Sequence, residues 1–503
     1  MNTIKRIAAA AGALALVMSA SACDNSNLTD LNRNPNAPEE VSPELLFPQG
    51  TSAAVDRVRT SLELVPQGIG STWPQYVAEY QYPEISYYLF RSTTADADWN
   101  GFYSGPLQDF RAALTVAEAA GRVNQVGPIL VMRAWTYQFL TGMWGDIPFT
   151  EANRGDEGLI TPTYDAQQVV YDSLLASLAR ANTILTNSGT DFTFAGRDPI
   201  AGYNGTPERW RRFANSLRAR LGLNLSKVLP ARAQAEVVAA INAGGFTSNT
   251  EDAQINWPGN TAGNSNPWWA NQIEGGGTRD DARLSVTFVD SLKSLSDPRL
   301  PIFARPTQAA PNDYQGMPNG LEAGAAGAWG TRSSRFGPQV FARAQPSYVM
   351  SFAEFSFIKA EAAERGWIPG GAVTARQYYE EGIRASMQDW GVAETAITTY
   401  LAQPRVLYAG GTAGLQQILL QKWIAAFTAG FEAWSEWRRT NCPTLTPAAN
   451  ARTNPASIPR RVLYPQTEQS FNDANLQAAI SSQGGQELTN RLWIDPAGGA
   501  ICP

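Results

Sequence analysis

The sequence predicts a mainly α-helical fold with long irregular loops. Apolar residues recur at the three- and four-residue spacing of helices along most of the chain. Two long stretches rich in glycine, proline and small residues, 247–279 and 305–346, interrupt this pattern. Alternation of apolar and polar residues is scarce, so any sheet should be small.

The first expected helices occupy residues 43–62, 107–120 and 129–144. Pro43 suits the first turn of a helix, where a missing N–H costs nothing. Residues 129–144 are apolar on nearly every face, which indicates an interior helix, and Gly145 and Pro148 end it. Further helices are expected over 165–185, 208–225, 232–243, 285–295, 348–365, 372–389, 415–427 and 431–438. A last polar segment, 450–503, should wrap up the chain.

The helices at 348–365 and 372–389 should form a hairpin, joined by a turn at residues 369–371. The second helix carries Ala375, Tyr379 and Gly382, which match half of a tetratricopeptide repeat. The Trp and Gly of the other half are missing. The hairpin is therefore a partial match to a tetratricopeptide-like helix pair.

Charge and composition exclude several functions. The 503 residues carry a net charge of −6, which makes the chain a poor candidate for binding nucleic acid. The sequence has no histidine, which excludes catalytic triads, HExxH proteases and histidine-ligated metals. Its 15 Trp, 17 Tyr and 20 Phe favour binding over catalysis. We expect no cofactor.

No metal site is expected either. Residues 96–101 resemble the first half of an EF-hand loop, but the twelfth position is Leu107 rather than a bidentate glutamate. We interpret 96–101 as an ordinary turn before the helix at Leu107.

The N-terminus has the features of a lipoprotein signal peptide over residues 1–22. A positive start and 12 apolar residues precede small residues and Cys23. We expect Cys23 to be lipidated and residues 23–37 to form a polar tether. An ordinary secretory signal cleaved after Ala22 is the alternative. No other stretch reaches about 18 apolar residues, so the body should be soluble and held to the membrane by its lipid.

Two cysteines remain, Cys442 and Cys502. Export implies an oxidising compartment, which favours a disulfide between them that would hold the C-terminal tail. Two unpaired buried thiols are the alternative.

Charged motifs on the expected helices are interpreted as structural. The arginines of 208–221 and of 434–439 should lie on packed helix faces with local carboxylate partners. Carboxylate pairs such as Glu361 with Glu364, and Glu380 with Glu381, should lie on solvated faces.

Aromatic residues in the loops are the candidate ligand contacts. An exposed ring can stack on the apolar face of a sugar while polar neighbours bind its hydroxyl groups. The alternative is that the rings anchor the loops to the body. The candidates are Trp73, Tyr76, Tyr80, Trp268, Trp269 and Trp329.

Eight segments stand in a specific order along most of the chain. They read LNRNPNAP at 31–38, GDIPFTEA at 145–152, RWRRFANSLRARL at 209–221, DPRL at 297–300, FSFIKAEAA at 355–363, YEEGI at 379–383, QKWI at 421–424 with WSEWRRT at 434–440, and IPRR at 458–461 with YP at 464–465. Together they resemble the SusD/RagB family of outer-membrane lipoproteins, in its SusD-like branch.

The resemblance implies a fold and a function. The fold would be a scaffold of four tetratricopeptide-like helix pairs with long loops packed on it, over residues 38–503. The protein would be lipid-anchored at the outer membrane, facing the cell exterior, and would capture an oligosaccharide or a peptide. It would act as the lid of a SusC-type TonB-dependent transporter and would not be an enzyme. The family's ligand residues vary, so none is carried over.

Two other functions remain open at this point. One is a helical glycan-cleaving enzyme that uses carboxylates. The other is a scaffold that binds only protein.

Overall fold

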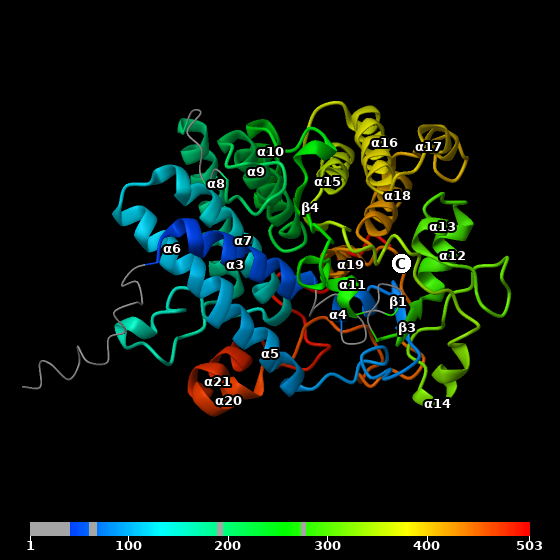
Figure 1. Ribbon diagram of the computed structural model, residues 1–503, viewed down its shortest axis with the longest axis horizontal. Coiled ribbons are helices and arrows are strands. Elements are labelled where there is room, and N and C mark those ends of the chain that lie inside the picture. Colours follow the sequence, from blue (N-terminus) through cyan, green and yellow to red (C-terminus); the bar gives the residue numbers. More distant parts are fainter. Residues whose placement is uncertain are drawn as a thin grey trace, which may run out of the picture. The chain divides into compact units, whose positions relative to one another are not determined.

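The structure is a computed structural model that describes residues 41–59, 68–188, 194, 196–271, 273 and 278–502. The expected signal peptide, Cys23 and the tether lie outside the described residues. From Pro43 onward the chain forms one unit. This unit is mainly helical, which confirms the predicted fold class (Figure 1). None of the helices in the described part of the chain is long and apolar enough to span a bilayer.

The helices of the first half pack against one another in chain order. Proline opens three of them, because the first N–H groups of a helix have no partner within it. The successive contacts join α3 (Pro43–Arg57) to α6 (Gln108–Ala119), α6 to α7 (Val123–Trp144), α7 to α8 (Gln167–Asn187), α8 to α9 (Pro207–Asn224) and α9 to α10 (Pro230–Ala243).

Helix α7 is the predicted interior helix. All of its 22 residues are buried except Val123, Asn124 and Arg133. It begins six residues earlier than predicted, and Gly127 lies in this extra part. A Cβ atom at Gly127 would lie 2.7 Å from Leu185 of α8, so glycine permits the close approach of the two helices.

The predicted hairpin is formed by α15 (Phe352–Glu364) and α16 (Gly371–Asp389), which pack closely together. Gly382 makes the contact possible, since a Cβ atom there would lie 2.8 Å from the ring of Phe357. Tyr379 is buried, and its hydroxyl donates to the carbonyl of Val406 (2.9 Å). The residues of the half-matched repeat are therefore packing residues.

Further helices complete the fold, two of them beside this hairpin. Helix α18 (Gly411–Ala425) packs against both of its members, and α19 (Gly430–Thr440) packs against α18 and α9. The others are α5 (Ser92–Phe102), α12 (Val286–Ser294), α17 (Glu394–Leu401), α20 (Gln466–Phe471) and α21 (Asp473–Ser482). Short helical turns are α4 (Ile69–Thr72), η2 (Tyr103–Leu107), η3 (Gly155–Glu157), η4 (Asn249–Glu251), η5 (Ala262–Asn264), α11 (Pro267–Asn271), α13 (Leu300–Phe303), α14 (Ala323–Ala326) and η7 (Gly327–Trp329).

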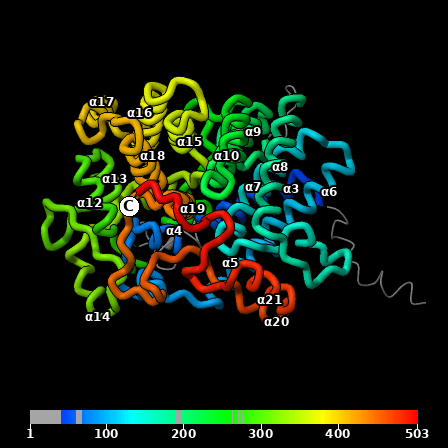
Figure 2. The backbone as a smooth tube through the Cα atoms, turned by 180° about the vertical axis from the view of Figure 1, so that it is seen from behind, coloured from blue at the N-terminus to red at the C-terminus, as the bar shows by residue number. Residues whose placement is uncertain are grey.

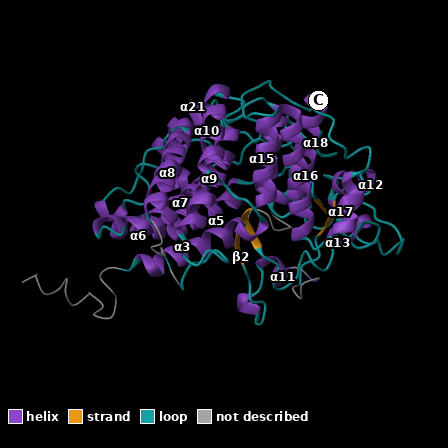
Figure 3. Ribbon diagram, turned by 90° about the horizontal axis from the view of Figure 1, so that it is seen from above, coloured by secondary structure: helices purple, strands orange, loops and turns teal. Residues whose placement is uncertain are grey.

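The described sheets are small, as predicted (Figure 3). Strand β1 (Val77–Glu79) pairs antiparallel with β3 (Ala282–Leu284). Strand β2 (Ala253–Ile255) pairs antiparallel with β4 (Ser347–Met350). Each pair joins segments that are far apart in the sequence.

Several elements differ from the prediction. Residues 347–350 form a strand rather than a helix start, because β2 pairs with them. Residues 96–101 lie in helix α5 rather than in a turn, with Trp99 and Phe102 buried. Helices α17, α20 and α21 were not predicted. Helix α21 buries only Leu476 and Ala479, so its apolar period is too weak to detect in the sequence.

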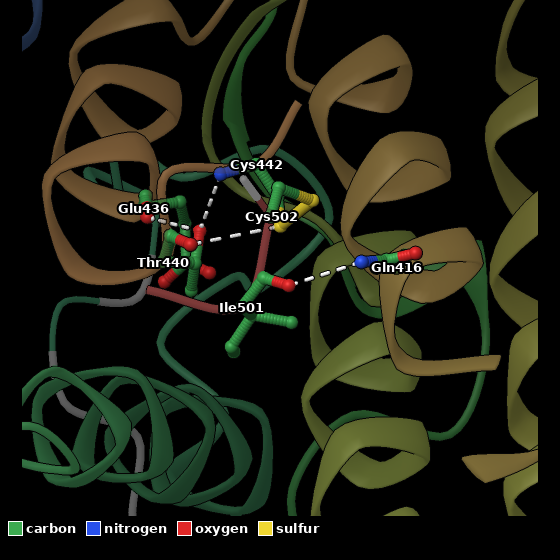
Figure 4. Close-up of a disulfide and its surroundings, with 6 residues drawn as sticks. All are labelled: Gln416, Glu436, Thr440, Cys442, Ile501 and Cys502. Carbon is green, nitrogen blue, oxygen red and sulfur yellow. Dashed lines mark hydrogen bonds between the residues drawn. A yellow bond between two sulfur atoms is a disulfide. The ribbon is translucent and has the colours of Figure 1, made fainter. Parts of the chain in front are cut away.

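The C-terminal segment runs across the back of the helices (Figure 2, red). Gln167 of α8 accepts a hydrogen bond from the N–H of Ile494 (3.0 Å), and Lys227 pairs with Asp495 (2.7 Å). Further along this segment, Cys502 is bonded to Cys442, which follows α19 (Figure 4). The C-terminal segment is therefore held against the helices by specific side-chain contacts.

Candidate functional site

A surface built on β1 and β3 carries two of the predicted ligand contacts. Tyr80 follows β1 directly, and its N–H donates to the carbonyl of Asp281 (2.9 Å). Trp329 ends the one-turn helix η7, which directly follows α14, the helix labelled in Figure 1. Both rings are half-buried and pack against the same small apolar cluster. The fold thus brings together two rings from distant parts of the sequence.

We call this region the Tyr80–Trp329 surface. It also includes the exposed ring of Tyr82 and several charged side chains on neighbouring loops. These charged residues are Arg279, Asp280, Asp281, Arg283, Arg305, Arg332 and Arg335.

Tyr82, whose side chain is 63% exposed, lies in a loop that hydrogen bonds between Glu79 and Ser86 hold closed. The N–H of Glu79 donates to Oγ of Ser86 (2.9 Å), and the hydroxyl and N–H of Ser86 donate to Oε2 of Glu79 (3.2 and 3.3 Å). Burial raises the pKa of Glu79 well above its ordinary value, although the hydrogen bonds from Ser86 oppose this. The loop is therefore closed by a buried carboxyl group that favours its neutral form.

Arg283 covers the ring of Tyr80. Its Cζ lies 4.2 Å from the ring centroid, a cation–π distance. The guanidinium donates to both oxygens of Asp280 (2.6 and 3.2 Å) and to the carbonyl of Gly330 (2.8 Å). Burial would raise the pKa of Asp280, but hydrogen bonds from Arg283 and Arg335 hold it below its ordinary value. Asp280 is therefore ionised and fixes two arginines.

Each of the three rings faces an arginine. Arg332 lies 4.8 Å from the ring centroid of Trp329, and its N–H donates to the Trp329 carbonyl (3.1 Å). Arg279 lies 5.4 Å from the centroid of Tyr82. Between the first two rings, a Cβ atom at position 330 would lie 3.0 Å from Tyr80, so Gly330 allows the loop to approach that ring.

Trp73 and Tyr76 are core residues, which corrects their prediction as ligand contacts. Neither side chain has exposed surface. Trp73 packs edge-on against Trp434, with centroids 5.1 Å apart. Tyr76 stacks on Trp423 at 5.0 Å, and its hydroxyl donates to the Trp423 carbonyl. These rings anchor their loop to the helices, as the alternative interpretation held.

The neighbouring tryptophans of α11 differ from each other. Trp268 is 7% exposed, and its Nε1 donates to the carbonyl of Arg59 (2.7 Å), so it too is an anchor rather than a ligand contact. Trp269 is half-buried, with Arg343 at 4.3 Å from its centroid. Trp269 thus has exposed surface, but it does not belong to the Tyr80–Trp329 surface.

The charged residues of this surface were missed by the sequence reasoning. The segment RDDAR at 279–283 places arginines at the end of the first glycine-rich stretch, and TRSSR at 331–335 places two more within the second. That pattern was a usable signal, because these stretches otherwise contain few charges. Their convergence on Tyr80 depends on the pairing of β1 with β3.

Two hollows elsewhere are less suited to a sugar chain. A cavity between α15, α18 and α19 contains about 50 Å³ of space, which is room for only a few water molecules. A groove of about 440 Å³ lies along Trp99, Tyr103 and Glu468. It is large enough for a ligand, but Trp99 is 3% exposed and offers almost no ring face.

The carboxylate pairs have structural partners. Glu361 is fully buried and binds Arg439, which corrects the expectation of a solvated face. Glu364 accepts a hydrogen bond from the hydroxyl of Tyr408 (2.5 Å). Glu380 pairs with Arg376, and Glu381 with Lys359. Among the described residues, no group of three acidic or cysteine side chains could hold a metal ion.

The comparisons with known proteins identify the family. A profile of the SusD-like family, described as "Starch-binding associating with outer membrane", matches residues 35–465. The chain therefore belongs to the SusD-like family, and the resemblance seen in the sequence is confirmed. No curated protein matches the sequence significantly.

Solved structures of SusD homologues have the same fold. A chitin-binding SusD homologue from Flavobacterium johnsoniae superposes with a TM-score of 0.78 at 26% identity, covering 89% of this chain and 98% of that one. A second chitin-binding protein gives 0.77 at 26% identity over 89% and 100% of the two chains. A SusD homologue from Bacteroides fragilis gives 0.76 at 25% identity over 91% and 100%.

Proposed function

We propose that the protein is a non-catalytic outer-membrane lipoprotein that captures an oligosaccharide at the Tyr80–Trp329 surface. The observation that carries the proposal is the meeting of Tyr80, Tyr82 and Trp329 on one exposed site. Half-exposed rings beside fixed hydrogen-bonding groups are the usual means of binding sugar rings. The family's description and the chitin-binding neighbours support an oligosaccharide rather than a peptide.

We further propose that the protein is the lid of a SusC-type TonB-dependent transporter. Lipidated Cys23 would hold it at the outer membrane, facing the exterior, with residues 23–37 as the tether. A lid of this kind works by population shift: the ligand favours the closed state only by its differential affinity for that state. A few stacked rings, each worth about 1 kcal/mol beyond area burial, allow capture without permanent retention.

The two alternatives are less well supported. A carboxylate enzyme would need free carboxyl groups near the rings, whereas Asp280 is fixed by two arginines. Exposed rings also suit protein interfaces, so what disfavours a pure protein scaffold is the family's description and the chitin-binding neighbours, which name glycans.

The test is calorimetric titration of residues 25–503 with chitin, starch and other oligosaccharides and with peptides, followed by analysis of each mixture for cleavage. We expect micromolar binding of one oligosaccharide class with the ligand intact. Trp329→Ala should weaken binding about five- to tenfold, since it removes one stacking ring. Cleaved ligand would contradict the proposal.

A matched control is Trp367→Ala. Trp367 is also half-buried and also faces an arginine, Arg365 at 5.4 Å, but it lies after α15. Its loss should leave affinity unchanged. Equal effects of the two variants would remove Trp329 from the site. Co-purification of the lipidated protein with a TonB-dependent barrel tests the proposed lid. Failure of the two proteins to co-purify would contradict the lid but not the capture of a ligand.

A further inference from the structure

The Tyr80–Trp329 surface is basic, although the whole chain has a net charge of −6. Its described residues include five arginines but only two aspartates. Asp280 pairs with both Arg283 and Arg335, and Asp281 pairs with Arg279 (2.5 Å). Glu322 lies in the same stretch of chain as Trp329, just before α14, but its carboxylate is paired with Arg452 (2.7 Å). Neither aspartate pairs with Arg305 or Arg332, so these two arginines carry positive charge that no ion pair between described residues neutralises.

Arg332 is the first source of this charge. Its side chain is exposed and lies over Trp329 at 4.8 Å. Within the described part of the chain, no carboxylate lies within ion-pair distance of it. The turn fixes its position, because the N–H of Arg332 and the hydroxyl of Ser333 both donate to the Trp329 carbonyl (3.1 and 2.6 Å). A ring and a cation are thus presented together.

Arg305 is the second source. Its N–H donates to the carbonyl of Arg335 (2.9 Å), and Ala304 forms an isolated antiparallel β-bridge with Phe336. The segment that begins at Ala304 therefore runs beside the segment that carries Arg332. The Nε of Arg305 is buried without a hydrogen-bond partner. A buried donor without a partner costs free energy unless a ligand or water satisfies it.

We infer that this surface binds an acidic glycan, with Arg332 and Arg305 binding its carboxylate or sulfate groups while its sugar rings stack on Trp329 and Tyr80. The inference rests on the proposed function and names its ligand class. A guanidinium group presents a planar fork of donors that matches a carboxylate or sulfate. A neutral sugar would leave the excess charge of the surface unused.

The experiment compares pairs of glycans with the same backbone, using residues 25–503. Oligogalacturonate is compared with its methyl ester, and a sulfated galactan oligosaccharide with its desulfated form. We expect at least tenfold tighter binding of one acidic member than of its neutral counterpart. Raising NaCl from 50 to 500 mM should weaken that binding, because salt screens exposed charges. The two pairs distinguish carboxylate from sulfate.

Variants locate the effect. Arg332→Gln should remove most of the preference for the acidic member, and Arg332→Lys should restore only part, since lysine keeps the charge without the fork. Arg197→Gln removes an exposed arginine elsewhere and should change nothing. Equal binding of both members of each pair, or the same loss in Arg197→Gln, would overturn the inference. Tight binding of neutral chitin oligosaccharides alone would overturn it while leaving glycan capture intact.

Discussion

Glu361 is a single buried carboxylate that joins three helices. From α15 it accepts hydrogen bonds from both terminal nitrogens of Arg439 on α19 (2.6 and 2.7 Å) and from Nε of Arg365 (2.8 Å). Arg439 also binds Glu436, which pairs with Lys422 of α18 (3.2 Å). Burial would raise the pKa of Glu361, but Arg439 above all lowers it to about 2. The ionised form is therefore built into the fold.

We expect Glu361→Gln to lower the free energy of unfolding by about 3–5 kcal/mol, because it leaves buried Arg439 without its full countercharge. Urea denaturation at pH 7 measures this. Glu380→Gln is the matched control, since Glu380 pairs with exposed Arg376 on a helix surface. That change should cost less than about 0.5 kcal/mol. A similar cost for both variants would show that the buried network adds nothing.

Asp389 makes the free energy of unfolding fall as the pH rises. Burial raises its pKa to about 7, while a hydrogen bond from Nδ2 of Asn249 (2.6 Å) opposes this. An unfolded aspartate titrates near pH 4. Between these values the folded protein binds more protons than the unfolded chain, so the free energy of unfolding falls as pH rises from about 4 to about 7. Nearby Asp252, whose pKa burial also raises, adds to this trend.

Asp389→Asn should therefore raise the free energy of unfolding at pH 8 by about 1–3 kcal/mol and flatten its decline with pH. Denaturation curves from pH 5 to pH 8 check this. Asp290→Asn, at an exposed position of α12, should change neither quantity. An unchanged pH profile in Asp389→Asn would show that Asp389 is already ionised at pH 5.

At the scale of elements, the disulfide holds the C-terminal segment to α19 (Figure 4). The N–H of Ile501 donates to the carbonyl of Thr440 (2.8 Å), and its carbonyl accepts from Gln416 of α18 (3.0 Å). The two cysteines are 60 residues apart and both buried. The disulfide therefore closes a long loop of the chain that contains α20 and α21.

The double variant Cys442→Ser, Cys502→Ser should lose about 2–4 kcal/mol of unfolding free energy, as expected for a loop of this length. Chemical denaturation of the variant and of the oxidised parent measures the loss. Reduced parent protein should match the variant. Unchanged stability would show that the hydrogen bonds of Ile501 hold the tail without help.

The elements that were predicted correctly have strong apolar periods. Helices α7, α9 and α16 bury wide faces, so their sequences specify them locally. Helix α21 and strand β4 could not be predicted in this way. The first has almost no buried face, and the second exists because β2 lies beside it. Pairing between distant segments leaves no local signal.

At the scale of the whole molecule, the candidate site is assembled from three distant stretches. Tyr80, Arg283 and Trp329 meet because β1 pairs with β3 and because the loop at 329–336 runs beside β3. Sequence reasoning chose aromatic residues in loops, but it could not tell an anchor from an exposed ring. Trp73 and Trp329 are both tryptophans in segments expected to be loops, and only their packing shows that the first is buried and the second is partly exposed.

The helical fold class, the family and the exclusion of histidine chemistry could all be predicted from the amino-acid sequence. These follow from apolar period, ordered motifs and composition, which are properties of short segments. Packing in three dimensions was needed to establish which rings are exposed, which carboxylates are buried and which of the described arginines lack a carboxylate partner. Those outcomes depend on contacts between residues hundreds of positions apart, because exposure and charge pairing arise only when the chain packs.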